Sequence, residues 1–233
     1  MLGKTDKYGI VKRYRISERK FRVLHRCFCT DCTAVQAAKI CLVNRNTSQR
    51  YFAFFRRLIV EAAWEERELY QIGNGVEVDE SYFGPRRVRG KRGRGASKKV
   101  IVFGLLKRNG KVFTQVISRA SQAEILPIIR QTVKSGSDIY SDGWRSYDAL
   151  GIYGYNHKKV KHEDNEFTDG ERHINGIESF WSWTKSRLNK FHGFTREQFS
   201  QNLLESEYRF NHRSDLEKQL RRLIRKHKVS GVI

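Results

Sequence analysis

Three acidic residues lie in sequence contexts that could bring their carboxylates to one place. Asp79 falls in VEVDES, where alternating apolar and polar residues predict a strand, and Asp142 ends a short apolar run that predicts another. Glu178 lies later, in a segment with helical spacing. Because functional groups of an open α/β sheet gather at the ends of adjacent central strands, the two aspartates could meet there. The helix would then supply the third carboxylate.

Carboxylates that converge in this way repel one another unless cations neutralise them. Hard oxygen ligands suit Mg²⁺ or Mn²⁺, and a pair of such ions can stabilise both the attacking and the leaving oxygen of an in-line phosphoryl transfer. The pattern therefore predicts a two-metal site with nuclease or strand-transfer chemistry. Taken singly, each acid has a plainer interpretation, as a turn or cap residue or as a solvated helix position.

Two further polar residues share the predicted helix with Glu178. Lys185 follows it by seven residues, close to two helical turns, so both side chains project from the same face. A metal ligand and a phosphate-binding cation would then share one ridge, although Lys185 could instead take part in a surface ion pair. Asn175 precedes Glu178 by three residues on that face and is an alternative third ligand.

The elements that must position these residues form an α/β pattern. Periodicity predicts three strands, a helix, a fourth strand and a long late helix, at 76–81, 99–106, 111–118, 121–133, 138–143 and 174–188. The turn at 108–110 makes the second and third strands antiparallel. The expected sheet is therefore mixed.

The first seventy residues are predicted to be helical. Apolar residues at helical spacing indicate two short helices, at 34–42 and 51–59, around a tight turn. This is typical of a DNA-binding helix-turn-helix, in which Arg50, Arg56 and Arg57 would contact phosphates or base edges. An ordinary helical hairpin with a solvated basic face has the same pattern.

Positive charge dominates the composition. The chain has 46 Lys and Arg against 25 Asp and Glu, a net charge of +21, which indicates a polyanionic partner such as nucleic acid, or else a generally adhesive basic surface. Between the first two strands, GPRRVRGKRGRGASKK carries eight basic residues and no acidic one, and is either a DNA-backbone contact or a solvated linker. Its candidate DNA-binding residues are Arg86, Arg87, Arg89, Lys91, Arg92 and Arg94.

The cysteines and the hydropathy pattern indicate a cytoplasmic protein. Only Cys29 and Cys32, of the set Cys27, Cys29, Cys32 and Cys41, have the pair spacing of a zinc ligand set, so free thiols are favoured and zinc is not expected. No apolar run approaches the roughly 20 residues of a membrane span. The N-terminal sequence also lacks a signal-peptide core.

Several segments together resemble a known family. VEVDESYFG, KRGRGASKKVIVFGLLKRNGKV, IYSDGWRSY, HINGIESFWSWTKSRLNKFHGF and YRFNHR, which span about 76–213, are similar to bacterial insertion-sequence transposases of the ISXO-like group. The resemblance implies an α/β fold with an RNase-H-like mixed sheet, whose metal ligands are Asp79, Asp142 and Glu178. It also implies that Lys185 fills the basic position after the third acid. Some members of the group use Asn at the third position, which keeps Asn175 as an alternative.

The same resemblance implies a reaction and its partners. Hydrolysis at the ends of a mobile element would leave a free 3′-hydroxyl, which then attacks target DNA. The partners would be double-stranded DNA, as inverted repeats and as target, and further copies of the chain in a synaptic complex acting at the bacterial nucleoid. Relatives often carry a zinc ribbon before the helix-turn-helix, and its paired CxxC motifs do not occur here.

The expected organisation is a helix-turn-helix region at 1–70, a catalytic domain at 71–212 and a basic tail at 213–233. Two other functions fit the same residues. One is an RNase-H-like nuclease or resolvase, which would share the acids and the basic surface. The other is a DNA-binding protein that has lost its catalytic activity, against which the intact set of acids and Lys185 argues.

Overall fold

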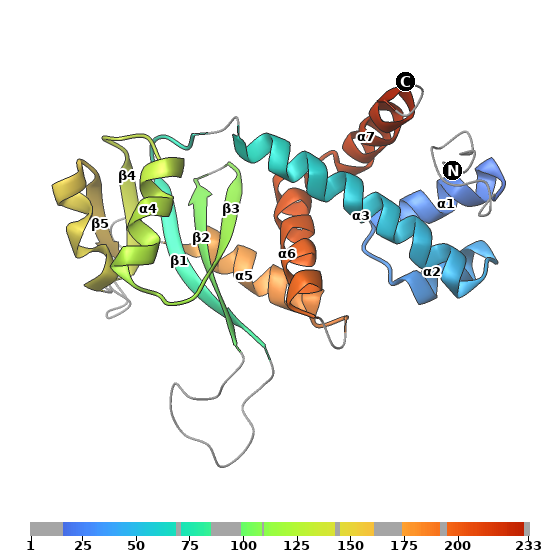
Figure 1. Ribbon diagram of the computed structural model, residues 1–233, viewed down its shortest axis with the longest axis horizontal. Helices are drawn as coiled ribbons and strands as arrows, with labels where there is room; N and C mark the ends of the chain where they lie inside the picture. The colour runs from blue at the N-terminus through green and yellow to red at the C-terminus, as the bar shows by residue number, and fades with distance from the viewer. Residues whose placement is uncertain are drawn as a thin grey trace, which may run out of the picture. The chain divides into compact units, whose positions relative to one another are not determined.

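The chain divides into two compact units (Figure 1). The computed structural model describes residues 16–68, 71–84, 99–108, 110–142, 145–160, 174–191 and 195–230. Met1–Glu66 with Phe194–Ile233 form the helical unit, and Arg67–Gly193 form the sheet unit. No described helix is both long and apolar enough to cross a membrane.

The described residues of the sheet unit form a five-stranded sheet in the order β3-β2-β1-β4-β5. β1 pairs antiparallel with β2 and parallel with β4, while β2–β3 is antiparallel and β4–β5 is parallel. The strands are β1 (Val76–Phe83), β2 (Val100–Lys107), β3 (Val112–Ile117), β4 (Asp138–Asp142) and β5 (Asn156–Val160). The helices are α4 (Gln122–Thr132), the 3-10 helix η2 (Arg145–Tyr153) and α5 (Asn175–Leu188).

The expected order of three strands, a helix and a fourth strand is confirmed, and with it the RNase-H-like mixed sheet. The turn between β2 and β3 joins antiparallel strands as predicted, although its Asn109 lies outside the described residues. The fifth strand, Asn156–Val160, was not predicted. Its sequence NHKKV is polar because the strand lies at the edge of the sheet, and only Val160 is buried.

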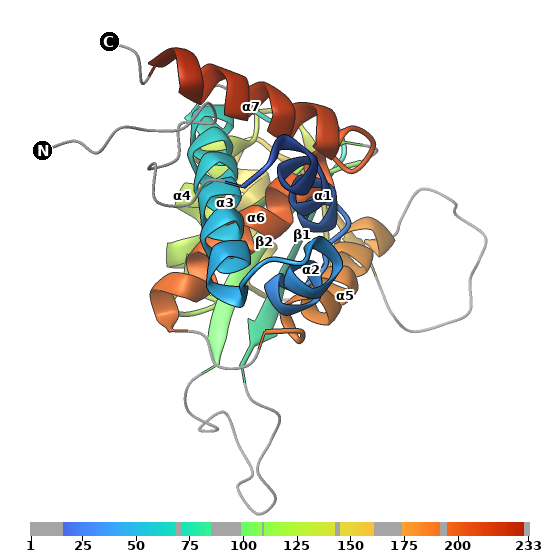
Figure 2. The ribbon, with the colours of Figure 1, turned by 90° about the vertical axis from the view of Figure 1, so that its right-hand side faces the viewer.

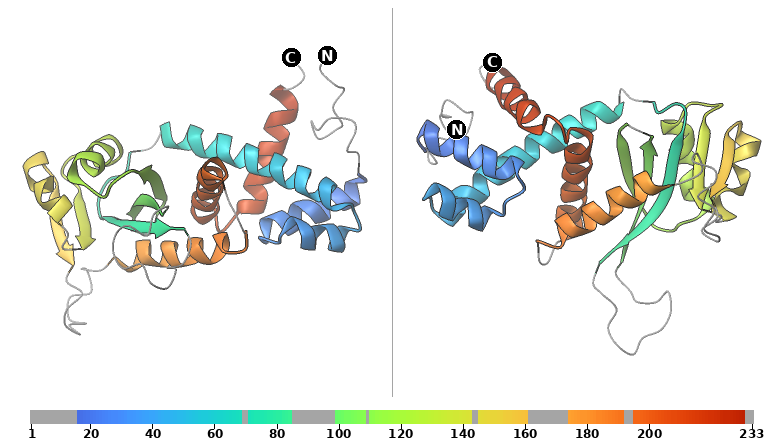
Figure 3. Two further views of the ribbon diagram at one scale, coloured as in Figure 1. Left: turned by 60° about the horizontal axis from the view of Figure 1, so that its bottom comes forward. Right: turned by 180° about the vertical axis from the view of Figure 1, so that it is seen from behind.

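α4 and α5 cover opposite faces of the sheet (Figure 3). Because strand residues alternate between faces, Val76 and Val78 point into the core formed with Ile125 and Ile129 of α4. Glu77 and Asp79, which alternate with these valines, point to the α5 side. The alternation within VEVDES therefore separates a packing face from the face that carries the acid.

A glycine lets α5 approach the sheet closely. A Cβ atom on Gly104, which pairs with Asp79 across β1 and β2, would lie 2.5 Å from Cζ2 of Trp181 and 3.0 Å from Cδ1 of Ile177. The first distance is shorter than carbon atoms tolerate, and the second is tighter than most Cβ contacts. The space above this position is thus occupied by α5 side chains.

In the part that the structure describes, the helical unit has five helices, from two separate stretches of the chain. They are α1 (Glu18–Cys29), α2 (Ala34–Cys41), α3 (Arg45–Glu68), α6 (Arg196–Asn211) and α7 (Leu216–Ser230). The second predicted helix, 51–59, is much longer than expected, because the Asn44 side chain accepts a hydrogen bond from the backbone of Asn46 (2.8 Å) and starts α3 at Arg45. Apolar residues then continue in helical phase to Ala63.

The organisation expected for the C-terminal third needs correction. The segment 213–233 is not a tail along its described part: α7 is an amphipathic helix whose Leu220 and Ile224 are buried in the core of the helical unit. α7 lies against α1 (Figure 2). α6 belongs to the same unit, so the contacts divide the chain after residues 66 and 193 rather than after 70 and 212.

We expect Gly104→Ala to destabilise the sheet unit by about 1–3 kcal/mol, because the added methyl group forces Trp181 or the helix to shift. Urea unfolding measures this change. Gly151→Ala is the matched control, since a Cβ atom there meets nothing within 4 Å. Equal stability of the two variants would contradict the close approach of α5.

Candidate active site

Asp79 and Asp142 lie on neighbouring parallel strands. β1 and β4 pair Val76 with Ile139 and Glu77 with Tyr140, and the same register continued by two residues sets Asp142 level with Asp79. Alternation then places both aspartates on the α5 side of the sheet. The prediction that strand ends bring these two acids together is therefore supported by the register itself.

The electrostatics of Asp79 identify its neighbours. Burial, as the largest cause, together with the charges of Asp142 and Glu178, raises the pKa of the Asp79 carboxyl to about 6. A hydrogen bond from the backbone of Glu80 acts in the opposite direction. The charges of the other two predicted acids therefore act on Asp79. Within the described ranges, however, no three His, Cys, Asp or Glu side chains are grouped closely enough to hold a metal ion.

Glu178 and Lys185 occupy one ridge of α5, as the helical spacing predicted. Glu178 lies in the first turn and is exposed, and so is Asn175, the first residue of the helix. Between Glu178 and Lys185, the buried Trp181 ring packs edge-on against Phe83 of β1, with ring centroids 5.9 Å apart. The Lys185 ammonium lies 5.8 Å from the centroid of the same Phe83 ring. This ridge therefore runs over the strand that carries Asp79.

The indole N–H of Trp181 also bears on Asp79. It lowers the pKa of the Asp79 carboxyl, yet among the described atoms it makes no hydrogen bond of normal geometry. The indole N–H therefore acts as a favourable dipole near the carboxylate. Trp181 is thus mainly a packing residue that borders the acids.

Glu77, which the sequence analysis did not single out, fixes the start of α5. Its side chain is buried, and Oε2 accepts a hydrogen bond of 2.9 Å from the backbone N–H of Ile177 in the first turn of the helix. A Cβ atom on Gly176 would lie only 2.8 Å from the same oxygen, so a glycine is needed there. The carboxylate also meets the positive end of the helix dipole. Glu178 follows directly after this anchor.

Arg108 balances the buried charge of Glu77. Its Nε lies 3.3 Å from Oε1 of Glu77, and its guanidinium lies 3.6 Å from the centroid of the Tyr140 ring on β4. Since Glu77 and Tyr140 are register partners, Arg108 links β1 through the ion pair and β4 through the ring contact to the turn after β2. The signal that could have identified Glu77 is its phase, because it shares the face of Asp79.

Polar contacts on the opposite face support the ends of the same two strands. The Tyr147 hydroxyl donates a 2.5 Å hydrogen bond to Oε1 of Glu80, whose pKa burial raises to about 7. Ser141 contacts Nε2 of His157 at 2.8 Å, and its hydroxyl donates to the backbone carbonyl of Asp142 at 2.7 Å. These residues lack a sequence signal, because their partners come from η2 and the unpredicted β5.

The predicted DNA-contacting arginines of α3 have different surroundings. Arg50 is exposed. Arg56 pairs with the fully buried Glu205 at 2.5 Å, so it contributes to the interior of the helical unit rather than to a free surface. Arg57 lies 3.7 Å from Glu61 on the next turn. The candidates Arg86, Arg87, Arg89, Lys91, Arg92 and Arg94 lie outside the described residues.

The four cysteines are free thiols. Burial raises the pKa of Cys27 to about 11 and that of Cys29 to about 12, which keeps both protonated at neutral pH. Cys27 and Cys41 pack in the core of the helical unit, with Cys29 and Cys32 at its edge.

We expect Glu77→Ala to lower the free energy of unfolding by about 3–5 kcal/mol, because it leaves Arg108 and the start of α5 without their buried partner. Glu77→Gln keeps an acceptor for the Ile177 N–H and should cost less, about 1–3 kcal/mol. Urea unfolding and hydrogen exchange of the Ile177 amide measure both changes. The control is Asp148→Asn, which breaks an exposed ion pair with Lys159. A Glu77→Ala variant no less stable than this control would show that the anchor is unimportant.

A family model and two relatives of this chain all have transposition in their descriptions. Residues 71–211 match the model of the ISXO2-like transposase domain. A Haemophilus influenzae protein described as an uncharacterized transposase-like protein is 40% identical over 110 residues, which cover 47% of this chain and 88% of that protein. A Halobacterium salinarum protein described as an uncharacterized protein in transposable element ISH50 is 29% identical over 141 residues, covering 54% of this chain and 48% of its own.

Solved structures of the Mos1 transposase are also similar, at low identity. The Mos1 strand transfer complex matches with a TM-score of 0.40 and 12% identity over 92% of this chain and 80% of that one. The catalytic domain of the Mos1 mariner transposase matches with a TM-score of 0.37 and 10% identity, over 92% of this chain and 96% of that one. The family assignment depends on the domain model, which spans more than half of the chain. The chain therefore belongs to the family of ISXO2-like transposases.

Proposed function

We propose that this insertion-sequence transposase cuts the ends of its element and joins the resulting 3′-hydroxyl strand to target DNA by metal-dependent phosphoryl transfer. The proposal is carried by one observation. Asp79 and Asp142 share a face and a level on neighbouring parallel strands, and the charge of Glu178 acts on Asp79 from the first turn of α5.

The donor set suits hard divalent cations. Asp79, Asp142 and Glu178 offer carboxylate oxygens, which Mg²⁺ and Mn²⁺ prefer. The raised pKa of Asp79 means that its ionised form is disfavoured by burial and by the neighbouring acids, a cost that a bound cation would relieve. When bound, a pair of such ions supplies charge stabilisation to the attacking and the leaving oxygen.

The other residues of the site would position DNA. Lys185 is exposed beyond Trp181 on the ridge that begins at Glu178, where its ammonium could contact a phosphate next to the scissile bond. Glu77 would keep α5, and with it Glu178, at a fixed height above β1. The basic segment that contains Arg86 to Arg94 follows β1 directly and would lie along the DNA backbone.

Two further parts of the proposal follow from the reaction. Both ends of an element must be cut and brought together, so we propose a synaptic complex of two or more copies on double-stranded DNA. α2 and α3 would recognise the inverted repeats, with Arg50 and Arg57 as the α3 arginines on the exposed side of the helix.

We expect Asp79→Asn and Asp142→Asn each to lower metal-dependent cleavage and joining by about 10³-fold or more, because each removes a charged ligand from the reacting centre. Binding to an element-end duplex should change less than about threefold, since it depends on other surfaces. The assay joins a labelled 3′-hydroxyl end to plasmid DNA, which separates a transposase from a nuclease that only cuts.

Asp138→Asn is the matched control, with the same substitution four residues before Asp142 on β4. Its carboxylate pairs with Lys158 at the other end of the strand, so activity should be retained. Full activity of Asp79→Asn or Asp142→Asn would sink the assignment, whereas cleavage without joining would favour the nuclease.

The identity of the third ligand can be tested on α5. We expect Glu178→Gln to lose cleavage as the aspartate variants do, and Asn175→Ala to keep it within about tenfold, because of these two residues Glu178 alone carries a charge, and that charge acts on Asp79. Cleavage is measured across a Mn²⁺ titration for each variant. A loss confined to Asn175→Ala would instead make Asn175 the third ligand.

A further inference from the structure

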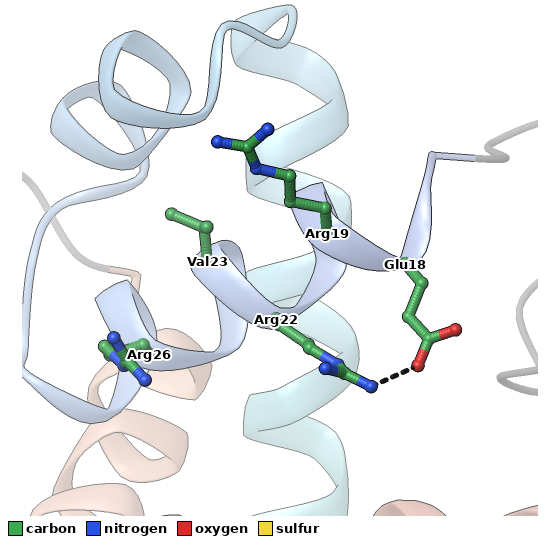
Figure 4. A pocket seen from close by; sticks show the side chains of 5 residues that line it. All are labelled: Glu18, Arg19, Arg22, Val23 and Arg26. Carbon is green, nitrogen blue, oxygen red and sulfur yellow. Dashed lines mark hydrogen bonds and ion pairs between the residues drawn. The ribbon is translucent and has the colours of Figure 1, made fainter.

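Arginines line the solvent side of α1. Arg19, Arg22 and Arg26 follow one another at steps of three and four residues, so they share one side of the helix, while Phe21 and Leu24 are buried on the other. Figure 4 shows these arginines around a hollow of about 370 Å³, which Glu18 and Val23 also line. Glu18 forms an ion pair with Arg22 of the same helix, at 2.7 Å.

α7 presents a second basic side next to the first. It packs against α1 through its apolar face, and exposes Lys218, Arg221, Arg222 and Arg225 to solvent. Glu217 pairs with Arg221 one turn later on the same helix. Glu217, like Glu18 on α1, therefore forms an ion pair with an arginine of its own helix.

α1 and α7 contact each other, so their exposed basic sides lie on adjacent helices. Burial, as the largest cause, and the charges of Arg221 and Arg26 lower the pKa of the buried His25 to about 4, against the opposing charge of Glu217. We call the exposed basic residues of the two helices the α1–α7 surface: Arg19, Arg22, Arg26, Lys218, Arg221, Arg222 and Arg225.

Most of the charge on this surface is available to a ligand. Over the described part of the chain, Arg19, Arg26, Lys218, Arg222 and Arg225 form no ion pair with an acidic side chain. The predicted α3 arginines differ, because Arg56 is tied to Glu205 and Arg57 lies near Glu61. α1 and α7 therefore expose arginines and a lysine without such an ion pair, whereas Arg56 of α3 is held by a buried acid.

We propose that the α1–α7 surface binds the phosphate backbone of double-stranded DNA, in addition to the contacts made by α3. Guanidinium groups form paired hydrogen bonds with phosphate oxygens, and arginines spaced along two helices can follow a backbone without reading bases. The surface would add affinity that is independent of sequence and sensitive to salt. The inference deepens the proposed function, since it assumes DNA as the partner of the helical unit.

The test is the salt dependence of DNA binding by the full chain, in EDTA, with a random-sequence duplex and an element-end duplex. Two double variants, Arg19→Gln/Arg26→Gln and Arg222→Gln/Arg225→Gln, each remove two charges. We expect each to reduce the slope of log K against log[salt] by about 2, equally on both duplexes. The control, Arg119→Gln/Lys134→Gln, removes two exposed charges from the sheet unit and should leave the slope near that of the wild type.

A charge-retaining variant separates phosphate binding from packing. Arg19→Lys/Arg26→Lys should keep most of the wild-type slope, because lysine also neutralises a phosphate. If both Gln variants had the same slope as the control, the proposal would be overturned. The α1–α7 surface would then be an ordinary solvated surface. Because the measurement needs neither metal nor cleavage, its failure is distinguishable from failure of the proposed catalytic function, which the aspartate variants test.

Discussion

A single hydrogen bond, from the backbone N–H of Ile177 to the buried carboxylate of Glu77, sets where α5 begins relative to the central strand. The candidate site depends on this contact, because two of its carboxylates come from the sheet and the third from the helix. A helix free to slide along the sheet would move Glu178 by 1.5 Å for every residue of shift. The anchor also explains a buried carboxylate that would otherwise be costly, since a helix terminus and Arg108 both compensate its charge.

The second constraint is the close approach of α5 to the sheet, which two glycines allow. Gly104 lies on β2, and Gly176 lies in the first turn of α5. A Cβ atom added at Gly104 would come within 2.5 Å of an atom of another residue, and one added at Gly176 within 2.8 Å. Trp181 then fills the space above Gly104 and packs against Phe83. The anchor fixes the height of the helix, and this packing fixes its rotation, so that Glu178 and Lys185 share the side that borders the acids. Site geometry and core packing are here the same set of contacts.

The sequence predicted those parts of this arrangement that are local. Alternation along β1 and helical spacing along α5 indicate which face a residue occupies, so the faces of Asp79 and of the Glu178–Lys185 ridge could be predicted from pattern, whereas their role as a metal site stays a prediction. A sequence pattern does not predict which residue of another element a side chain will contact. The Glu77–Ile177 bond joins residues 100 positions apart and the Arg56–Glu205 pair 149 positions apart, so neither was predictable. β5 was missed because an edge strand has too few buried positions to show alternation, and α7 because its charge hid a narrow apolar stripe.

The helical unit is made from two separate stretches of chain, with the whole sheet unit encoded between them. On the ribosome, α1, α2 and α3 are therefore made long before α6 and α7. Until α6 emerges, Arg56 has no Glu205, and the Phe28 carbonyl has no Arg209 to donate to it. The sheet unit can fold as a continuous segment during this interval, while the first three helices still lack the contacts that α6 and α7 make with them. A nascent chain of this protein should thus acquire its acidic centre before its helical unit is complete.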